Sequence, residues 1–201
     1  MSRANYANFE YDMQFQRLAL PDVFLVTPRR IGDARGFFAE TFSQRRLAEA
    51  AGVDESAFNF VQDNHSFSAA KGTLRGLHYQ SPPHAQGKLV QVLAGRIFDV
   101  AVDFRSGSPT YGHWVGAELS AANGTQIWVP PGFLHGFLTL EPDVHVMYKV
   151  TAYYDGPSDG AVRWSDPEIA IEWPDATTEP IVSAKDAAAP LLRDVISPFR
   201  Y

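Results

Sequence analysis

Short segments in which hydrophobic and polar residues alternate run through most of the chain. Within Arg96–Phe104, phenylalanine and valine occupy every second position, while Asp99 and Asp103 fall on the opposite side. Val144–Tyr154 alternates in the same way and places Tyr148 among the valines of one side. A period of two residues predicts β-strands. Three further segments are predicted as strands: Leu89–Leu93, Gln126–Val129 and Phe137–Leu140.

Helix signals are few and short. Ser43 stands at the start of a segment that reaches Ala51, and Gly52 follows its end. Ser183 followed by Asp186 resembles a capping box and predicts a second short helix. Glycine and proline mark turns between the strands throughout the chain. Many short strands at close spacing therefore predict an all-β fold, as a closed barrel or two facing sheets, with a few short flanking helices.

Length and composition fit a single globular domain. The chain has 201 residues, of which 45% are hydrophobic and 20% charged, an ordinary balance for a packed core. We expect one domain over 1–201, with an N-terminal extension over 1–18 and a C-terminal segment with a short helix over 175–201. Because the chain contains no cysteine, disulfides and cysteine-ligated metal sites are excluded.

Charge and hydropathy exclude several classes of partner. A formal net charge of −6 argues against a nucleic-acid surface, so an anionic ligand needs a local cluster of arginine and lysine. No apolar run is long enough to cross a membrane, and Met1–Gln16 does not have the pattern of a signal peptide. We expect a cytoplasmic protein that binds neither nucleic acid nor membrane.

Polar residues that do not suit a simple core gather in Gly72–Gln91. The segment holds Arg75, His78, His84 and Lys88 among apolar residues and glycines. A regular strand would place Arg75 and His78 on opposite faces, whereas a bulge at Gly76 would turn both toward one cavity. An edge strand with solvated polar groups explains the same pattern, and spacing alone leaves both interpretations open.

His135 lies between a Pro-Pro-Gly turn and an apolar strand, where core and pocket histidines both occur. The stretch Pro131-Gly132-Phe133-Leu134-His135 fits the second motif of the cupins, which are small jelly-roll barrels with a central pocket. The first cupin motif supplies H-x-H and a glutamate as metal ligands, and this chain has no H-x-H. A metal site is therefore poorly supported, although His78, His84 and His135 remain a possible ligand set.

Tyr148 shares one face of its strand with Val146 and Val150. A core tyrosine with a partnered hydroxyl is one interpretation. The other is a phenol inside a barrel pocket, placed to donate a proton.

Long segments in a consistent order resemble the dTDP-4-dehydrorhamnose 3,5-epimerase family. They span about Asp22 to Asp186 and comprise GDARGFFAETF (Gly32–Phe42), VQDNHSFS (Val61–Ser68), GTLRGLHYQSPPHAQGKLVQV (Gly72–Val92), FDVAVDFRSGSPTYGHWVG (Phe98–Gly116), QIWVPPGFLHGF (Gln126–Phe137) and YKVTAYY (Tyr148–Tyr154). The resemblance implies a cupin-like jelly-roll barrel that works as a homodimer, without a metal or another cofactor.

The resemblance also assigns roles to individual positions. It implies His78 as the catalytic base, Asp186 as the carboxylate that pairs with it, and Lys88 and Tyr148 as further catalytic groups. It implies that substrate is bound by Arg35, Phe38, Glu40, Gln62, Asn64, Arg75, His135, Asp159 and Lys185. Around Asp175–Asp186 the chain departs from the family by a small insertion.

These residue types suit proton transfer next to a ketone. A ketone at C4 of a sugar acidifies the hydrogens on C3 and C5, so a base must meet the C–H bond and a cation must stabilise the enolate. A histidine oriented by a carboxylate, such as His78 with Asp186, suits the base role. Lys88 has the charge for the enolate oxygen, and Tyr148 can return a proton to the opposite face.

The remaining residues suit a nucleotide diphosphate. Arg35 and Arg75 can grip phosphate oxygens in bidentate fashion, and Phe38 can stack on the base. The family resemblance, with which these residue types agree, implies conversion of dTDP-4-dehydro-6-deoxy-D-glucose to dTDP-4-dehydro-L-rhamnose. The alternatives are an epimerase that acts at C3 or C5 only, a metal-dependent cupin, and a sugar-nucleotide-binding barrel without activity.

Overall fold

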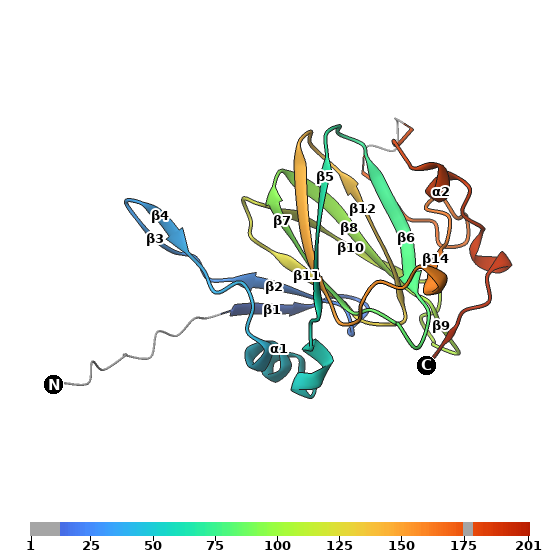
Figure 1. Cartoon of the computed structure of the whole chain (residues 1–201), viewed down its shortest axis with the longest axis horizontal. Helices are drawn as coiled ribbons and strands as arrows, with labels where there is room; N and C mark the ends of the chain where they lie inside the picture. The colour runs from blue at the N-terminus through green and yellow to red at the C-terminus, as the bar shows by residue number, and fades with distance from the viewer. Residues whose placement is uncertain (1–12, 175–178) are drawn as a thin grey trace.

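The computed structural model describes residues 13–174 and 179–201, and its main feature is a pair of antiparallel sheets that face each other (Figure 1). The larger sheet has the strand order β1 (Met13–Arg17), β2 (Phe24–Pro28), β11 (Gln126–Val129), β7 (Lys88–Ala94), β13 (Val144–Val150) and β5 (Gln62–Ser68). The smaller sheet has the order β10 (Trp114–Ser120), β8 (Arg96–Asp103), β12 (Phe133–Thr139), β6 (Leu74–Gln80) and β14 (Asp159–Ala161). This is the predicted cupin-like jelly roll.

Smaller elements flank the two sheets. Two short strand pairs are β3 (Ile31–Asp33) with β4 (Gly36–Phe38) and β9 (Arg105–Ser106) with β15 (Phe199–Arg200). The helices are α1 (Gln44–Ala51), α2 (Ala184–Ala187) and 3-10 turns at Glu55–Phe58, Gly156–Ser158 and Leu192–Asp194. No helix in the described ranges is long and apolar enough to cross a membrane.

Both predicted helices are confirmed. Ser43 precedes α1, although its side chain makes no capping hydrogen bond, and Gly52 ends the helix in the left-handed conformation. Ser183 caps α2 by accepting a hydrogen bond from the backbone N–H of Asp186. That cap fixes the start of α2 and hence the position of Asp186, which is buried.

The predicted strands are confirmed, with most boundaries shifted by at most one residue and two shifted further. The strand predicted from Val144 to Tyr154 ends at Val150, and the residues after it leave the sheet. The strand predicted from Phe137 begins earlier, at Phe133, so His135 is part of β12 and not of the turn before it. Within the predicted N-terminal extension, residues 13–17 form β1 and pair with β2, and residues 1–12 lie outside the described ranges. The single-domain boundaries stay a prediction.

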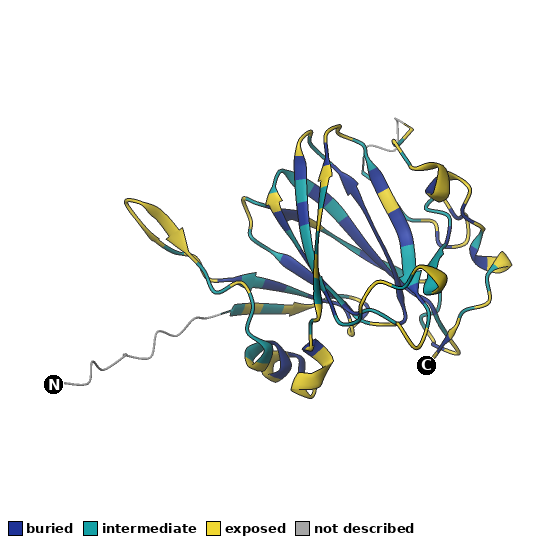
Figure 2. Ribbon diagram, viewed as in Figure 1, coloured by how far each residue is buried: buried dark blue, intermediate teal, exposed yellow. Residues whose placement is uncertain are grey.

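The main core lies between the two sheets and borders one end of a cavity. Val90 and Val146 from the larger sheet pack there against Ile97, Ala101 and Phe137 from the smaller one. Two further clusters cover the outer faces: α1 packs on the larger sheet, and the C-terminal segment packs on the smaller one. Figure 2 shows the strands largely buried, whereas the β3–β4 hairpin, which we call the arm, is exposed and projects away from the barrel.

Candidate active site

A cavity of about 380 Å³ opens between the sheets. Both sheets and the segment around α2 contribute to its wall. It is lined by Ser66, Thr73, Leu74, Arg75, His78, Lys88, His135, Phe137, Tyr148, Ile181, Val182, Ser183, Lys185 and Asp186. Seven of the thirteen residues predicted for the site therefore meet in one cavity: Arg75, His78, Lys88, His135, Tyr148, Lys185 and Asp186.

A bulge in β6 turns Arg75 and His78 to the same side, which confirms the bulged interpretation of this segment. His78 pairs with His135 and Arg75 pairs with Phe137. A three-residue step on β6 therefore lies opposite a two-residue step on β12, which is the mark of a bulge. The bulge needs glycine at position 76, whose φ is +136° and whose added Cβ would lie 2.6 Å from the Cα of Gly136. Without the extra residue, Arg75 and His78 would point to opposite faces of the sheet.

His78 and Asp186 form a histidine–carboxylate pair. The Nε2 atom of His78 lies 2.6 Å from Oδ1 of Asp186, which is only 3% exposed. Since an ionised carboxylate only accepts hydrogen bonds, Nε2 carries the proton and Nδ1 is left as the basic nitrogen. Burial lowers the pKa of His78 below its usual range, and Asp186 opposes this shift. The histidine is therefore neutral at pH 7 and able to take a proton.

The backbone holds Asp186 against β6 across a long stretch of sequence. Leu74 N donates to Ile181 O, Ile181 N donates to Gly72 O, and Thr73 pairs with Ile181 as an isolated bridge. These bonds dock the C-terminal segment on the strand that carries His78. The predicted pairing of His78 with Asp186 thus has a direct structural basis.

Lys88 shares the inward face of β7 with Val90 and Val92. Burial lowers the pKa of Lys88 to about 8, and the negative charge of Asp99 limits the shift. His135 lies on the inward face of β12, with its Nε2 atom 3.0 Å from both carboxylate oxygens of Asp99. Lys88 and His135 thus form the inner wall of the cavity.

Asp99 is a candidate site residue that the sequence analysis did not predict. It is fully buried on β8 between Ile97 and Ala101 on the inward face, and it orients His135. A buried carboxylate is stable only when it is paired and hydrogen-bonded. An aspartate inside an apolar strand was therefore a signal for a partnered charge.

Tyr148 faces the cavity from β13, in the sheet opposite to His78. It packs against the valines of the core, and burial raises the pKa of its phenol above the usual value of 10. Both sequence interpretations of this residue hold in part, because the ring borders the core while the residue lines the cavity. His78 and Tyr148 therefore approach a bound molecule from opposite walls.

Arg75 bridges the two sheets at the cavity. Its Nη2 donates to the carbonyl oxygen of Phe67 at 3.0 Å, and its Nε and Nη2 both lie 3.3 Å from the Ser68 hydroxyl on β5. Gln62 and Asn64 occupy the same strand and bond to each other at 2.8 Å, but they do not line the cavity.

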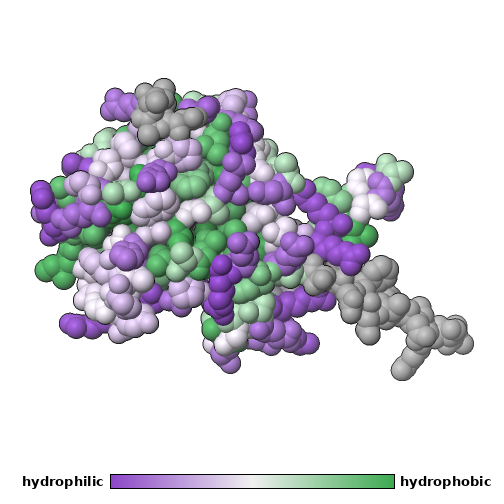
Figure 3. Space-filling model, turned by 180° about the vertical axis from the view of Figure 1, so that it is seen from behind, coloured by the Kyte–Doolittle hydropathy of each residue, from purple (hydrophilic) through white to green (hydrophobic). Residues whose placement is uncertain are grey.

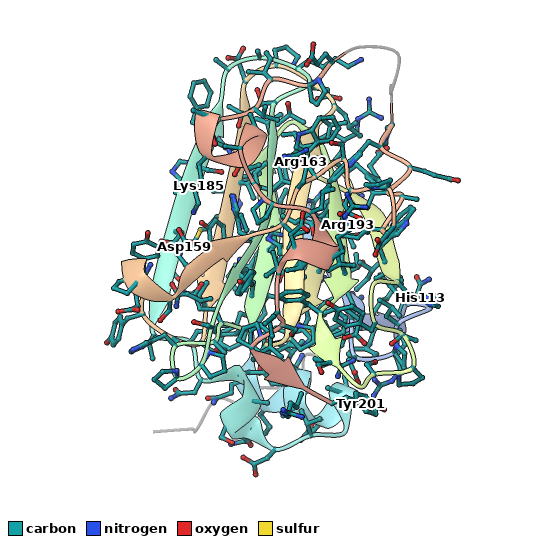
Figure 4. The ribbon with its side chains drawn as sticks, turned by 90° about the vertical axis from the view of Figure 1, so that its right-hand side faces the viewer. His113, Asp159, Arg163, Lys185, Arg193 and Tyr201 are labelled. Carbon is teal, nitrogen blue, oxygen red and sulfur yellow. The ribbon has the colours of Figure 1, made fainter. Side chains whose placement is uncertain are left out.

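Lys185 and Asp159 form an ion pair at the edge of the cavity. Figure 4 shows them coming from two different elements, with Lys185 on α2 and Asp159 at the start of β14. Asp159 also accepts a hydrogen bond from the Tyr154 hydroxyl at 3.3 Å. Asp159 therefore holds Lys185 at the cavity without lining it.

Arg35, Phe38 and Glu40 do not reach this cavity. Arg35 pairs with Asp33 on the arm at 2.5 Å, Phe38 is 62% exposed, and Glu40 lies 3.5 Å from Arg46 of α1. Viewed from behind, the arm stands clear of the body (Figure 3). Of the residues predicted to bind the nucleotide, Arg75 thus lies in the cavity, and Arg35 and Phe38 lie on the arm of the same chain. Glu40, Gln62 and Asn64 belong to neither.

The three histidines of the metal alternative do not form a common ligand set. His78 is bonded to Asp186 and His135 to Asp99, while His84 lies outside the cavity lining, near Asp155. In the described part of the chain, no group of three or more histidine, aspartate or glutamate side chains is arranged to hold a metal ion.

Comparison with known proteins identifies close relatives. The profile of the family described as dTDP-4-dehydrorhamnose 3,5-epimerase matches residues 17–194. A relative of that name from Sinorhizobium fredii is 49% identical across 94% of this chain and 95% of its own length. Another, from Salmonella typhimurium, is 51% identical across 88% of this chain and 93% of its own length.

A solved structure shares both the fold and the sequence pattern. It is the dTDP-6-deoxy-D-glucose-3,5-epimerase of Legionella pneumophila in complex with dTDP-4-keto-L-rhamnose, which is 46% identical to this chain. The two structures align with a TM-score of 0.88 over 94% of this chain and 99% of the other.

Proposed function

The chain belongs to the dTDP-4-dehydrorhamnose 3,5-epimerase family, and from this premise we propose that it converts dTDP-4-dehydro-6-deoxy-D-glucose to dTDP-4-dehydro-L-rhamnose. One observation carries the proposal. The His78–Asp186 pair and the Tyr148 phenol face each other across one cavity, with Lys88 in its wall. The Legionella pneumophila relative was solved with dTDP-4-keto-L-rhamnose.

His78 is the base of the proposed mechanism. Its Nδ1 atom takes the proton from the carbon next to the C4 ketone, at C3 or C5. Asp186 then stabilises the imidazolium through the hydrogen bond at Nε2. The lowered pKa of His78 keeps the base unprotonated at neutral pH.

Lys88 and His135 stabilise the negative charge that develops on the C4 oxygen. Lys88 carries a positive charge below about pH 8, and the cavity wall shields it from bulk water. A cation in such a setting stabilises an enolate far more than it would in water. Asp99 keeps His135 in a fixed orientation beside it.

Tyr148 is the proton donor on the other face of the sugar ring. Its raised pKa keeps the phenol protonated across the pH range in which His78 is neutral and Lys88 is charged. Removal of a proton from one face and return of a proton to the other inverts the carbon. The overall reaction needs no hydride transfer, and the proton balance closes by exchange with water.

Arg75 and Lys185, which both line the cavity, are the cations that bind the diphosphate. Arg75 is held against β5 by Phe67 and Ser68, so its guanidinium is already oriented for a phosphate. Gln62 and Asn64 lie on the same strand, outside the cavity lining. A cytoplasmic location stays a prediction.

We also propose that the protein works as a homodimer in which the arm of one protomer completes the cavity of its partner. The arm carries Arg35 and Phe38 away from its own barrel (Figure 1). Phe67 and Leu93, about half exposed, add apolar surface to the outer face of the larger sheet, which α1 does not cover completely. An exposed apolar face and an unused arm together fit a second copy of the chain.

Complementation tests this arrangement. We expect light scattering to give about twice the monomer mass of 22.3 kDa. When the variants His78→Asn and Arg35→Ala are coexpressed, random pairing gives about half mixed dimers, each with one intact site, so about a quarter of wild-type activity should return. Activity no higher than the sum of the two variants would mean that each arm serves its own barrel, and a monomeric mass would refute the dimer.

The reaction itself is tested by hydrogen exchange. In D2O, the protein should place deuterium at both C3 and C5 of dTDP-4-dehydro-6-deoxy-D-glucose, as seen by NMR. Label at a single carbon would identify an epimerase for one centre only. Binding of the nucleotide sugar without any label would contradict the proposed function and indicate a binding barrel.

A further inference from the structure

One hydroxyl in the cavity wall has no partner. Among the described residues, the buried side-chain oxygen atoms without a hydrogen bond are Oε1 of Glu40 and Oγ of Ser66. Oε1 of Glu40 forms an ion pair with Arg46 at 3.5 Å. Of these two atoms, the Ser66 hydroxyl alone is left without a partner. Since a buried hydroxyl without a partner is unfavourable, such a group in a native protein calls for an explanation.

The neighbours of Ser66 on β5 are already engaged. The inward face of this strand carries Asn64, Ser66 and Ser68 at every second position. Asn64 bonds to Gln62, and Ser68 bonds to Arg75. Ser66 lies between these two bonded groups and borders the cavity, yet it bonds to neither.

The position of Ser66 relative to Tyr148 indicates which part of a ligand it meets. Ser66 pairs with Val146 across the β5–β13 ladder, and Tyr148 is the next residue of β13 on the same face. Diagonal neighbours on one face of a sheet lie within reach of each other's side chains. A ligand group beside Ser66 is therefore also beside the proton donor, which places it in the hexose half of the substrate.

We propose that the Ser66 hydroxyl binds a ring hydroxyl of the hexose and so contributes to recognition of the sugar. The inference rests on the proposed function, because it takes a nucleotide sugar as the ligand. The Oγ atom itself is buried, but the residue lines the cavity, and rotation about its Cα–Cβ bond turns the hydroxyl toward a ligand. No existing hydrogen bond has to break for that rotation.

Replacement by alanine tests the proposal with two ligands. Calorimetry on Ser66→Ala should show an affinity for dTDP-D-glucose, an unreactive nucleotide sugar, lowered about tenfold. The affinity for dTDP, which lacks the sugar, should stay within about twofold of wild type. The melting temperature should not fall, since alanine removes a hydroxyl that bonds to nothing in the protein. A serine with a structural role would lower it.

Ser68→Ala is the matched control on the same strand. It removes one of the two groups that hold Arg75, so it should weaken dTDP and dTDP-D-glucose together. Equal weakening of both ligands by Ser66→Ala would place its contact on the diphosphate and overturn the assignment to the sugar. If Ser66→Ala bound dTDP and dTDP-D-glucose with wild-type affinity, Ser66 would contact neither ligand and the proposal would be wrong. Failure of the wild type to bind either ligand would instead refute the nucleotide-sugar function, and the role of Ser66 with it.

Discussion

Replacement of His78 by asparagine is expected to reduce turnover, and with it deuterium exchange at both carbons, by about 10²–10⁴-fold. Asparagine keeps a donor for Asp186 but supplies no basic nitrogen, so KM should change little. His113→Asn is the matched control, because His113 is exposed and lies away from Lys185 and Asp159 (Figure 4). Exchange at the wild-type rate in His78→Asn would show that another group removes the proton.

The same residue sets the acid limb of the pH profile. Burial lowers the pKa of His78 below its ordinary value of 6.5, so the base stays neutral down to that lowered pKa. As the pH falls through it, His78 becomes protonated and kcat/KM should drop. A midpoint above 6.5 would contradict the lowered pKa.

Replacement of Lys88 by methionine is expected to lower the activity and to raise the stability. Loss of the cation beside the enolate oxygen should lower kcat by about 10²–10³-fold. The free energy of unfolding at pH 7 should nevertheless rise by about 1–3 kcal/mol, because methionine fills a similar volume without a desolvated charge. Lys149→Met is the stability control: it removes an ion pair with Asp63 on the outer face of β13 and should change stability by less than about 1 kcal/mol.

The pH dependence of both effects follows from the lowered pKa of Lys88. That pKa is about 8 in the folded protein, against an ordinary lysine value of 10.5 in the unfolded chain. Below about pH 8 the lysine is charged in both states, so the full cost of burying the charge is present. Between about 8 and 10.5 the folded state releases its proton first, wild-type stability rises, and the advantage of Lys88→Met shrinks.

Activity should fall over the same interval, since a neutral Lys88 no longer stabilises the enolate. An alkaline limb near pH 8 in kcat/KM would therefore report Lys88, because burial raises the pKa of Tyr148 and keeps its phenol protonated there. Stability is measured by urea unfolding. Equal free energies of unfolding for Lys88→Met and wild type at pH 7 would contradict the cost that we assign to burying the Lys88 charge.

The sequence by itself determined the local features of this protein. Alternation placed β8 and β13, Gly52 ended α1, and the Ser183 cap began α2, because these signals act within a few residues of the chain. Gly76 between Arg75 and His78 indicated the bulge, since only glycine tolerates that backbone conformation and that close approach. The long family-like segments added the expected chemistry and the fold, which the comparisons confirm.

Only the tertiary structure decided which charges meet and how deeply they are buried. His78 and Asp186 are 108 positions apart and come together because the C-terminal segment docks on β6. Asp99 and Ser66 gain their significance from neighbours on other strands. The separation of Arg35 and Phe38 from the cavity likewise depends on the path of the arm. Desolvation and electrostatic interaction depend on distance in space, and separation along the chain does not determine that distance.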